Sequence, residues 1–262
     1  MNAAAAVIAA RSAWLHWGFM HYVRHALARA FGAVRLLDTA PSVPSGTPLL
    51  VVTNHPGWWD PLVFFYLNAA LFAPRRLFGP MDAAALARYR VLARLGLFGI
   101  ERDTSGGARR FLDVGSVILR TPATALWITA AGEFADVRRR PLALKPGVAH
   151  LVRRVPDAQV LPLAIEYGFW NEARPEVFAA FGAPLTADAA SMEAIEAQLG
   201  ATMDRLAGAV CARDPSPFVT LLAGRAGAGG VYDVCRQLAA WCRGQGFDAA
   251  HEITPPSAAR RR

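Results

Sequence analysis

Short apolar runs alternate with longer amphipathic segments along most of this chain. The run Leu49–Val52 is typical of a buried strand, because it is short, wholly apolar and contains two valines. Similar patterns predict strands over 76–79, 98–101, 125–129, 160–167 and 177–181, and helices over 58–72, 83–95, 107–119, 147–154 and 187–213. Strands that alternate with helices favour an α/β fold in which a mostly parallel or mixed sheet is flanked by helices.

Clusters of proline, glycine and serine divide the chain into three parts. The stretch 41–48, PSVPSGTP, separates an N-terminal helical segment from the alternating region, and the prolines of 214–217 close that region. We therefore expect amphipathic, membrane-associating helices over 1–40, the main α/β domain over 41–213 and a C-terminal extension over 214–262. The extension is predicted to contain a helix over 232–243 and to end in a disordered basic tail over 254–262.

The N-terminal segment 3–23 is apolar, but Arg11, His16 and His21 interrupt it. It has no uninterrupted apolar run of about 18 residues, which disfavours a membrane-spanning helix. Its basic residues do not precede the apolar run, which disfavours a secretory signal. We expect a helix at a membrane surface, the alternative being a helix packed against the domain. Its interfacial aromatic residues would be Trp14, Trp17, Phe19 and Tyr22, and its basic face would be His21, Arg24, His25 and Arg29.

Composition and charge indicate one large core and an anionic partner. With 262 residues, of which 54% are apolar, the chain can bury one substantial core. The net charge of +8 comes almost entirely from arginine, since Lys145 is the only lysine. Such a charge suits a membrane, a phosphorylated substrate or nucleic acid, although nucleotide bias can produce the same composition. The arginine clusters are dispersed and no nucleic-acid-binding motif occurs, so no nucleic-acid partner is expected.

The three cysteines form no C-x-x-C pair. No disulfide framework is indicated, and a reducing compartment is expected. Cys235 and Cys242 are spaced to share one face of a helix, where two small core residues are a more common outcome than a pair of metal ligands.

The stretch TNHPGWWDP, residues 53–61, holds the candidate chemistry. A strand that ends in a turn before a helix delivers side chains to the edge of an α/β sheet, where ligands usually bind. His55 and Asp60 are placed there, close enough for the carboxylate to bond one imidazole nitrogen. The other nitrogen would then be an acceptor, as a general base requires. The alternatives are a metal site, which lacks companion ligands nearby, and a histidine that caps a helix; a G-x-S-x-G serine-hydrolase elbow is absent.

This pattern resembles the first motif, N-H-x-x-x-x-D, of the glycerolipid (lysophosphatidic acid and glycerol-3-phosphate) acyltransferases. Three later stretches resemble that family in order: G-x-x-x-I-x-R over 96–102, a proline inside the apolar strand 161–165, and FGAP over 181–184. The resemblance covers roughly residues 45–190. It implies that Asn54, Arg102, Gly132 and Pro162 contribute to substrate binding, with Arg102 holding an anionic group of the acceptor.

The third family motif, P-E-G-T-R, is altered here to Ala130-Ala131-Gly132-Glu133-Phe134. Only the glycine matches, so the glutamate and arginine associated with acceptor binding are replaced by Ala131 and Phe134. Glu133 or Arg138 could contact the acceptor instead, or belong to a solvated loop. The departure puts the usual glycerol-phosphate acceptor in doubt rather than the chemistry at His55.

The resemblance implies transfer of a fatty acyl group from acyl-CoA or acyl carrier protein to the hydroxyl of a lysophospholipid or related lipid. His55 would be the general base and Asp60 would orient it, without a metal, a bound cofactor or an acyl-enzyme. Residues 41–213 would form the catalytic domain, and Trp58, Trp59, Phe64 and Phe65 are candidates for an acyl groove or for core. The protein is expected to lie peripherally on the cytoplasmic side of the inner (plasma) membrane.

Three alternatives remain open. The acceptor could be a non-phosphate lipid such as a glycolipid or an aminolipid. The chain could be a lipid-binding homologue without catalysis, or a thioesterase-like hydrolase in which the same two residues activate water.

Overall fold

The computed structural model describes residues 3–224, 237 and 240–241. Most of the predicted helix over 232–243, the predicted tail, Cys235 and Cys242 lie outside the described residues. The described strands are β1 (Ala33–Leu37), β2 (Leu49–Thr53), β3 (Arg76–Asp82), β4 (Leu97–Ile100), β5 (Thr124–Thr129), β6 (Gln159–Gly168), β7 (Glu176–Phe181) and β8 (Phe218–Ala223). The described helices are α1 (Ala3–Ala10), α2 (Ala13–Ala30), α3 (Asp60–Leu71), α4 (Ala83–Arg88), the 3-10 helix η1 (Arg90–Leu95), α5 (Ser105–Arg120), α6 (Gly147–Arg154) and α7 (Met192–Ala212).

One mixed sheet organises the described part of the chain, in the order β4-β3-β5-β2-β6-β7-β1-β8. The pairs from β4 to β6 and the pair β7–β1 are parallel, whereas β6–β7 and β1–β8 are antiparallel. This confirms the α/β class predicted from the sequence. Strand β2, which precedes the candidate motif, lies inside the sheet between β5 and β6.

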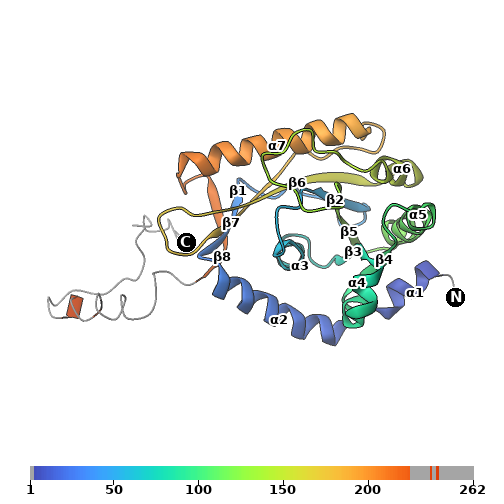
Figure 1. The fold of residues 1–262 in the computed structure, drawn as a ribbon, viewed down its shortest axis with the longest axis horizontal. Coiled ribbons are helices and arrows are strands. Elements are labelled where there is room, and N and C mark those ends of the chain that lie inside the picture. Colours follow the sequence, from blue (N-terminus) through green and yellow to red (C-terminus); the bar gives the residue numbers. More distant parts are fainter. Residues whose placement is uncertain (1–2, 225–236, 238–239, 242–262) are drawn as a thin grey trace.

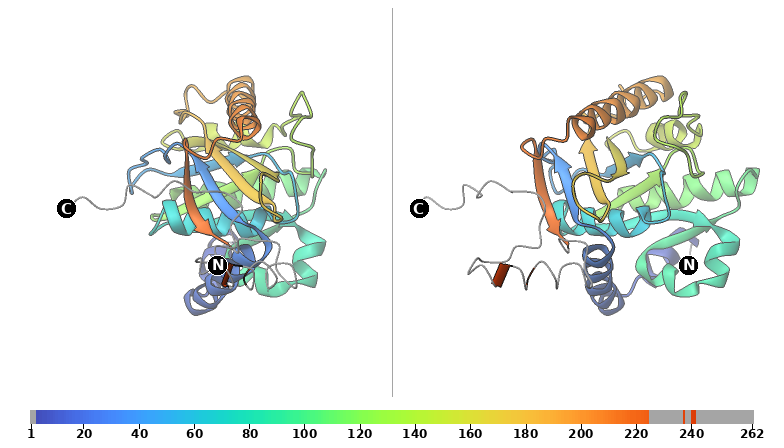
Figure 2. Two further views of the ribbon diagram at one scale, coloured as in Figure 1. Left: turned by 90° about the vertical axis from the view of Figure 1, so that its left-hand side faces the viewer. Right: turned by 60° about the vertical axis from the view of Figure 1, so that its left-hand side comes forward.

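Helices cover both faces of the sheet, and alternation along each strand feeds two cores (Figures 1 and 2). Leu50 and Val52 point into the core shared with α5, α6 and α7. Leu49 and Val51 point into the core shared with α2 and α3. All of β2 is therefore buried, which explains why its sequence is continuously apolar instead of alternating.

The two strands β1 and β8 were not predicted. We expected only helices over 1–40 and a helical extension beyond 214, but β1 pairs with β7, and β8 closes the sheet edge against β1. Both strands are short and owe their place to partners far away in the sequence, so no local pattern identifies them. The helix predicted over 83–95 is likewise divided into α4 and η1.

The N-terminal segment forms two helices that pack on the domain along part of their surface. Helix α1 contacts α5, and Val23 and Leu27 of α2 are fully buried. Phe19, expected at the membrane interface, is partly buried and contacts Phe65 with ring centroids 5.1 Å apart. Trp14 and Trp17 remain about 70% and 69% exposed. Among the helices of the described residues, none has the length and hydropathy of a membrane span.

His16 on α2 makes the docking of this helix sensitive to acid. Burial, and secondly the charge of Arg11, lower the pKa of His16 to about 4, and its Nδ1 is buried without a hydrogen-bond partner among the described residues. In the unfolded chain a histidine titrates near pH 6.5, so the unfolded state binds the extra proton first. Stability contributed by neutral His16 is thus complete above about pH 6.5 and is lost as the pH falls through about 4.

We expect the thermal unfolding midpoint of the wild type to fall more between about pH 7 and pH 4.5 than that of His16→Phe. The phenyl ring would keep the contact with Phe65, whose ring centroid lies 6.0 Å from that of His16, and would have no proton to gain. Differential scanning calorimetry of both proteins at the two pH values measures this difference. Equal falls would show that other groups carry the acid sensitivity.

Candidate active site

The candidate site begins where β2 ends, at the carboxyl edge of the sheet. Thr53 is the last residue of β2, Asn54 and His55 follow in a loop, and α3 begins at Asp60. Pro61 suits the first helical turn because that turn needs no backbone N–H donor there. A short loop between a fixed strand and a fixed helix therefore presents both candidate side chains at the same place.

His55 and Asp60 are directly bonded, with 2.6 Å between imidazole Nδ1 and carboxylate Oδ2. The Asp60 side chain is completely buried and the His55 side chain is 18% exposed. The backbone N–H of Gly57 also donates to Oδ2, at 3.1 Å. With the carboxylate facing Nδ1, the network assigns the proton of a neutral ring to Nδ1 and leaves Nε2 as a hydrogen-bond acceptor.

Tyr167, at the end of β6, completes the support of Asp60 and was not predicted. Its hydroxyl donates to the second carboxylate oxygen, Oδ1. Burial, the charge of Asp60 and this hydrogen bond all raise the pKa of Tyr167 above its ordinary value, so the hydroxyl stays protonated and remains a donor. The Tyr167 ring stacks on Phe31, which follows α2, with centroids 5.6 Å apart. The residue that follows α2 therefore packs against the tyrosine that supports Asp60.

Asn54 connects β2 to β6 beside the site. Its side-chain amide donates to the carbonyl of Ile165 and accepts from the N–H of Ile165, both at 2.8 Å. We predicted a substrate-binding role for Asn54 from the family resemblance. In the structure both ends of the amide are occupied by the backbone of β6, which positions the loop that carries His55.

The loop after β5 places an aromatic ring on His55. The Phe134 ring lies 4.3 Å from the imidazole, centroid to centroid, and remains 61% exposed. The neighbouring Ala135 N–H donates to the His55 carbonyl at 3.0 Å, which holds the loop against the site. Gly132 turns the loop with a φ of +72°, a conformation that glycine adopts readily and that Ala131 beside it does not need.

The other predicted contact residues are engaged within their own loops. Glu133 pairs with Arg139 at 2.9 Å, and Arg138 pairs with Asp136 at 2.7 Å. Hydrogen bonds from Arg138 lower the pKa of the Asp136 carboxyl. These exposed pairs are typical of a solvated loop, and their charges are already balanced locally.

Two further predicted residues form no described hydrogen bond with the His55–Asp60 pair. Arg102 is 54% exposed and lies 3.4 Å from Asp82. Pro162 is buried in β6, paired with Val52 of β2, and thus belongs to the sheet beneath the motif.

The aromatic candidates for an acyl groove differ in burial. Phe64 and Phe65 are buried in the core, whereas Trp58 is 66% exposed.

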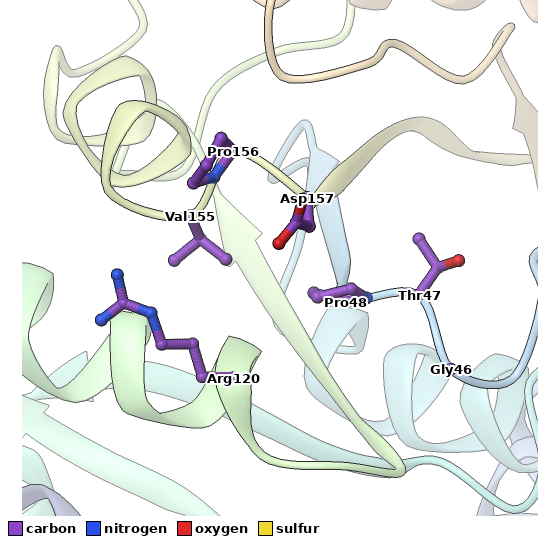
Figure 3. A pocket seen from close by; sticks show the side chains of 7 residues that line it. All are labelled: Gly46, Thr47, Pro48, Arg120, Val155, Pro156 and Asp157. Carbon is purple, nitrogen blue, oxygen red and sulfur yellow. The ribbon is translucent and has the colours of Figure 1, made fainter.

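A cavity of about 470 Å³ lined by Pro48, Arg120 and Asp157 lies at the amino ends of the strands, at the opposite edge of the sheet from His55 (Figure 3). Among the described residues, no group of three or more His, Cys, Asp or Glu side chains is placed to hold a metal.

The geometry is that of an oriented base. A buried carboxylate with three donors fixes one side of the ring, and Nε2 has no hydrogen-bond partner among the described residues. Such a ring can accept a proton from a hydroxyl or from water, and the carboxylate can stabilise the imidazolium that results. The sequence identified His55 and Asp60, and only the fold revealed Tyr167.

Comparison with known proteins agrees with this description. A family model described as Acyltransferase matches residues 35–166, half of the chain. The 1-acyl-sn-glycerophosphate (LPA) acyltransferase PlsC from Thermotoga maritima has a similar solved structure, with a TM-score of 0.53 and 15% sequence identity. The similarity covers 76% of this chain and 80% of that one, and at this identity it is a likeness of fold. A search of curated proteins found no match.

Proposed function

This chain belongs to the acyltransferase family, and from that premise we propose that it transfers a fatty acyl group from a thioester to the hydroxyl of a lipid, with His55 as the general base. The observation that supports this proposal is the bonded pair of His55 and buried Asp60, which leaves Nε2 available at the edge of the sheet. No protein nucleophile is needed, because the acceptor hydroxyl itself attacks.

In the proposed reaction Nε2 of His55 removes the hydroxyl proton as the oxygen attacks the thioester carbon. Asp60 stabilises the imidazolium, and Tyr167 and Gly57 keep the carboxylate in place. Collapse of the tetrahedral intermediate breaks the carbon–sulfur bond, and the thiolate recovers the proton from the imidazolium. The products are an ester and a free thiol, with both substrates bound together.

The acceptor has two candidates. A lysophospholipid would place its phosphate near Arg102, as the family resemblance implies. A glycolipid or aminolipid is favoured by Phe134, since an apolar ring lies on His55 where the family has an arginine. An aromatic face suits the C–H face of a sugar or an ammonium group better than a phosphate.

The test is thiol release from palmitoyl-CoA and from palmitoyl-acyl carrier protein, with lysophospholipids, glycolipids and aminolipids as acceptors and products resolved by mass. Release that depends on one acceptor would establish transfer and identify the lipid. Free fatty acid formed without any acceptor would indicate a hydrolase. Lipid binding with no turnover on either donor would indicate a binding protein.

We also propose that α2 docks the protein on the cytoplasmic face of the inner membrane, where a lipid acceptor would be found. Trp14, Trp17 and Tyr22 are exposed on this helix, and Arg24 and Arg29 are exposed on it as well. Exposed indoles beside basic residues are typical of a helix that lies at a membrane interface.

Replacing Trp14 and Trp17 together by serine should weaken binding to vesicles of phosphatidylglycerol and phosphatidylethanolamine by at least about tenfold, because each buried indole contributes about 1.5–3 kcal/mol. Deletion of the helix is a poorer test, since Val23 and Leu27 belong to the core. Co-sedimentation measures the effect. Phe169→Ser, a change at a 63% exposed ring near the end of α7, is the control. Equal binding by all three proteins would contradict docking through α2.

A further inference from the structure

A groove of about 770 Å³ lies at the outer edge of the sheet, between β4, α4, η1 and the start of α5, and no step of the proposed mechanism uses it. Its polar side chains are Arg90, Glu101 and Arg110, and the rest of its lining is mainly glycine and alanine with Leu86. A groove with a small-residue floor and two guanidinium groups combines space with positive charge.

Both arginines have guanidinium N–H donors that form no described hydrogen bond within the protein. The side chain of Arg90 has no hydrogen bond or ion pair among the described residues. Arg110 uses only its Nε, which donates to the carbonyl of Gly99 at 2.7 Å, so the guanidinium is oriented while its terminal nitrogens remain available. By contrast, the cations Arg102, Arg138 and Lys145 are paired with carboxylates. A guanidinium group matches phosphate oxygens well, so the groove suits a phosphorylated ligand.

Glycines keep the floor of the groove open. A Cβ at Gly107 would lie 1.8 Å from the carbonyl oxygen of Glu101. Only glycine therefore allows the start of α5 to lie this close to the backbone of Glu101. A Cβ at Gly106 would meet nothing within 4 Å, so this position faces open space. A side chain introduced at Gly106 would therefore occupy the groove without displacing its walls.

The distance from His55 decides which substrate fits. Strands β3 and β5 lie between β4 and β2, and three strand spacings of about 4.8 Å place the groove about 14 Å from the site. In a glycerol-phosphate acceptor the phosphate is only a few bonds from the reacting hydroxyl. Arg102, whose side chain lies against Asp82 at the end of β3, one strand nearer to β2, is placed to meet such a phosphate, whereas the groove beyond β4 is too far away. In acyl-CoA, a pantetheine arm of comparable extended length separates the thioester from the phosphorylated nucleotide.

We propose that this groove binds the 3′-phosphorylated adenosine diphosphate end of coenzyme A, while the thioester lies at His55. Arg90 and Arg110 would contact the phosphates, and Glu101 would accept a hydrogen bond from a ribose hydroxyl or the adenine amino group. The inference rests on the proposed acyl transfer and names coenzyme A as the carrier of the donor.

The direct test is titration calorimetry of the full-length protein with adenosine 3′,5′-bisphosphate, which needs no turnover. The wild type should bind it, and Gly106→Trp and Arg90→Glu should each weaken binding by about tenfold or more. Gly208→Trp on α7, where a Cβ also meets nothing within 4 Å, is the control for bulk. Arg109→Glu, an exposed arginine of α5 outside the lining, is the control for charge. No binding by the wild type, or equal binding by all variants, would overturn the proposal.

A kinetic comparison separates this proposal from the proposed function. With palmitoyl-CoA, the two groove variants should raise KM by about tenfold and leave kcat within about twofold. With S-palmitoyl-pantetheine, which lacks the nucleotide, they should behave like the wild type. Transfer by the wild type that is equally efficient from the two donors would overturn the groove assignment and leave acyl transfer standing. Failure of transfer from every donor, with bisphosphate still bound, would overturn the proposed function but not the nucleotide site.

Discussion

His55→Ala should lower acceptor-dependent acyl transfer by about 10²–10⁴-fold, the range that general-base catalysis supplies. The imidazole is held by Asp60 at 2.6 Å and Nε2 is its available acceptor, so no other described group at this position is placed to take the hydroxyl proton. The loss should fall on kcat, because the ring acts in the transition state rather than in substrate binding. Thiol release from the donor, measured with and without the acceptor lipid identified among those tested, measures this loss of kcat.

The fold should survive this change. Asp60 keeps its donors from Gly57 and Tyr167 when the imidazole is removed, so the buried carboxylate is not left without partners. His150→Ala, at an exposed histidine of α6, provides a matched control. A His55→Ala protein with a normal unfolding transition and wild-type kcat would eliminate His55 as the base.

Asp60→Asn should reduce kcat by at least about 100-fold while the protein still folds. The amide has nearly the shape of the carboxylate, and its oxygen in the place of Oδ2 can still accept hydrogen bonds from His55 and Gly57. Its negative charge is gone, however, and the imidazolium formed at His55 is no longer stabilised by a buried anion. Initial rates at saturating donor and acceptor measure the change, and urea unfolding measures the stability of the variant.

Tyr167→Phe separates the charge of Asp60 from the hydrogen bond that positions it. This variant removes one donor to Asp60 but leaves the negative charge and the stacking on Phe31. We expect about 1–3 kcal/mol of lost stability, because a buried acceptor loses a partner, and an activity within about tenfold of the wild type. Similar activity losses in Asp60→Asn and Tyr167→Phe would show that positioning, rather than charge, is what Asp60 provides.

The identity and proximity of the central pair could be predicted because they depend on local sequence. An apolar strand, a turn containing proline and glycine, and a helix start bring positions 55 and 60 together whatever the rest of the chain does. The predicted strands and most predicted helices were found for the same reason, since periodicity is a local property.

The support of the pair could not be predicted. Tyr167 reaches Asp60 only because β6 pairs with β2, and Phe31 reaches Tyr167 only because α2 packs across the end of the sheet. Phe134 was recognised as a departure from the family motif, but its contact with His55 depends on how the loop after β5 folds back. The roles predicted for Arg102, Glu133 and Arg138 remain proposals, and in the structure all three are paired with other charges.

By itself the sequence determined the α/β class, the order of most elements and the local geometry that joins His55 to Asp60. The tertiary structure alone decided the edge strands β1 and β8, the tyrosine behind the carboxylate and the groove beside β4. The physical reason is that residue patterns encode which face of an element is buried, whereas strand order and packing arise from contacts between segments distant in the chain.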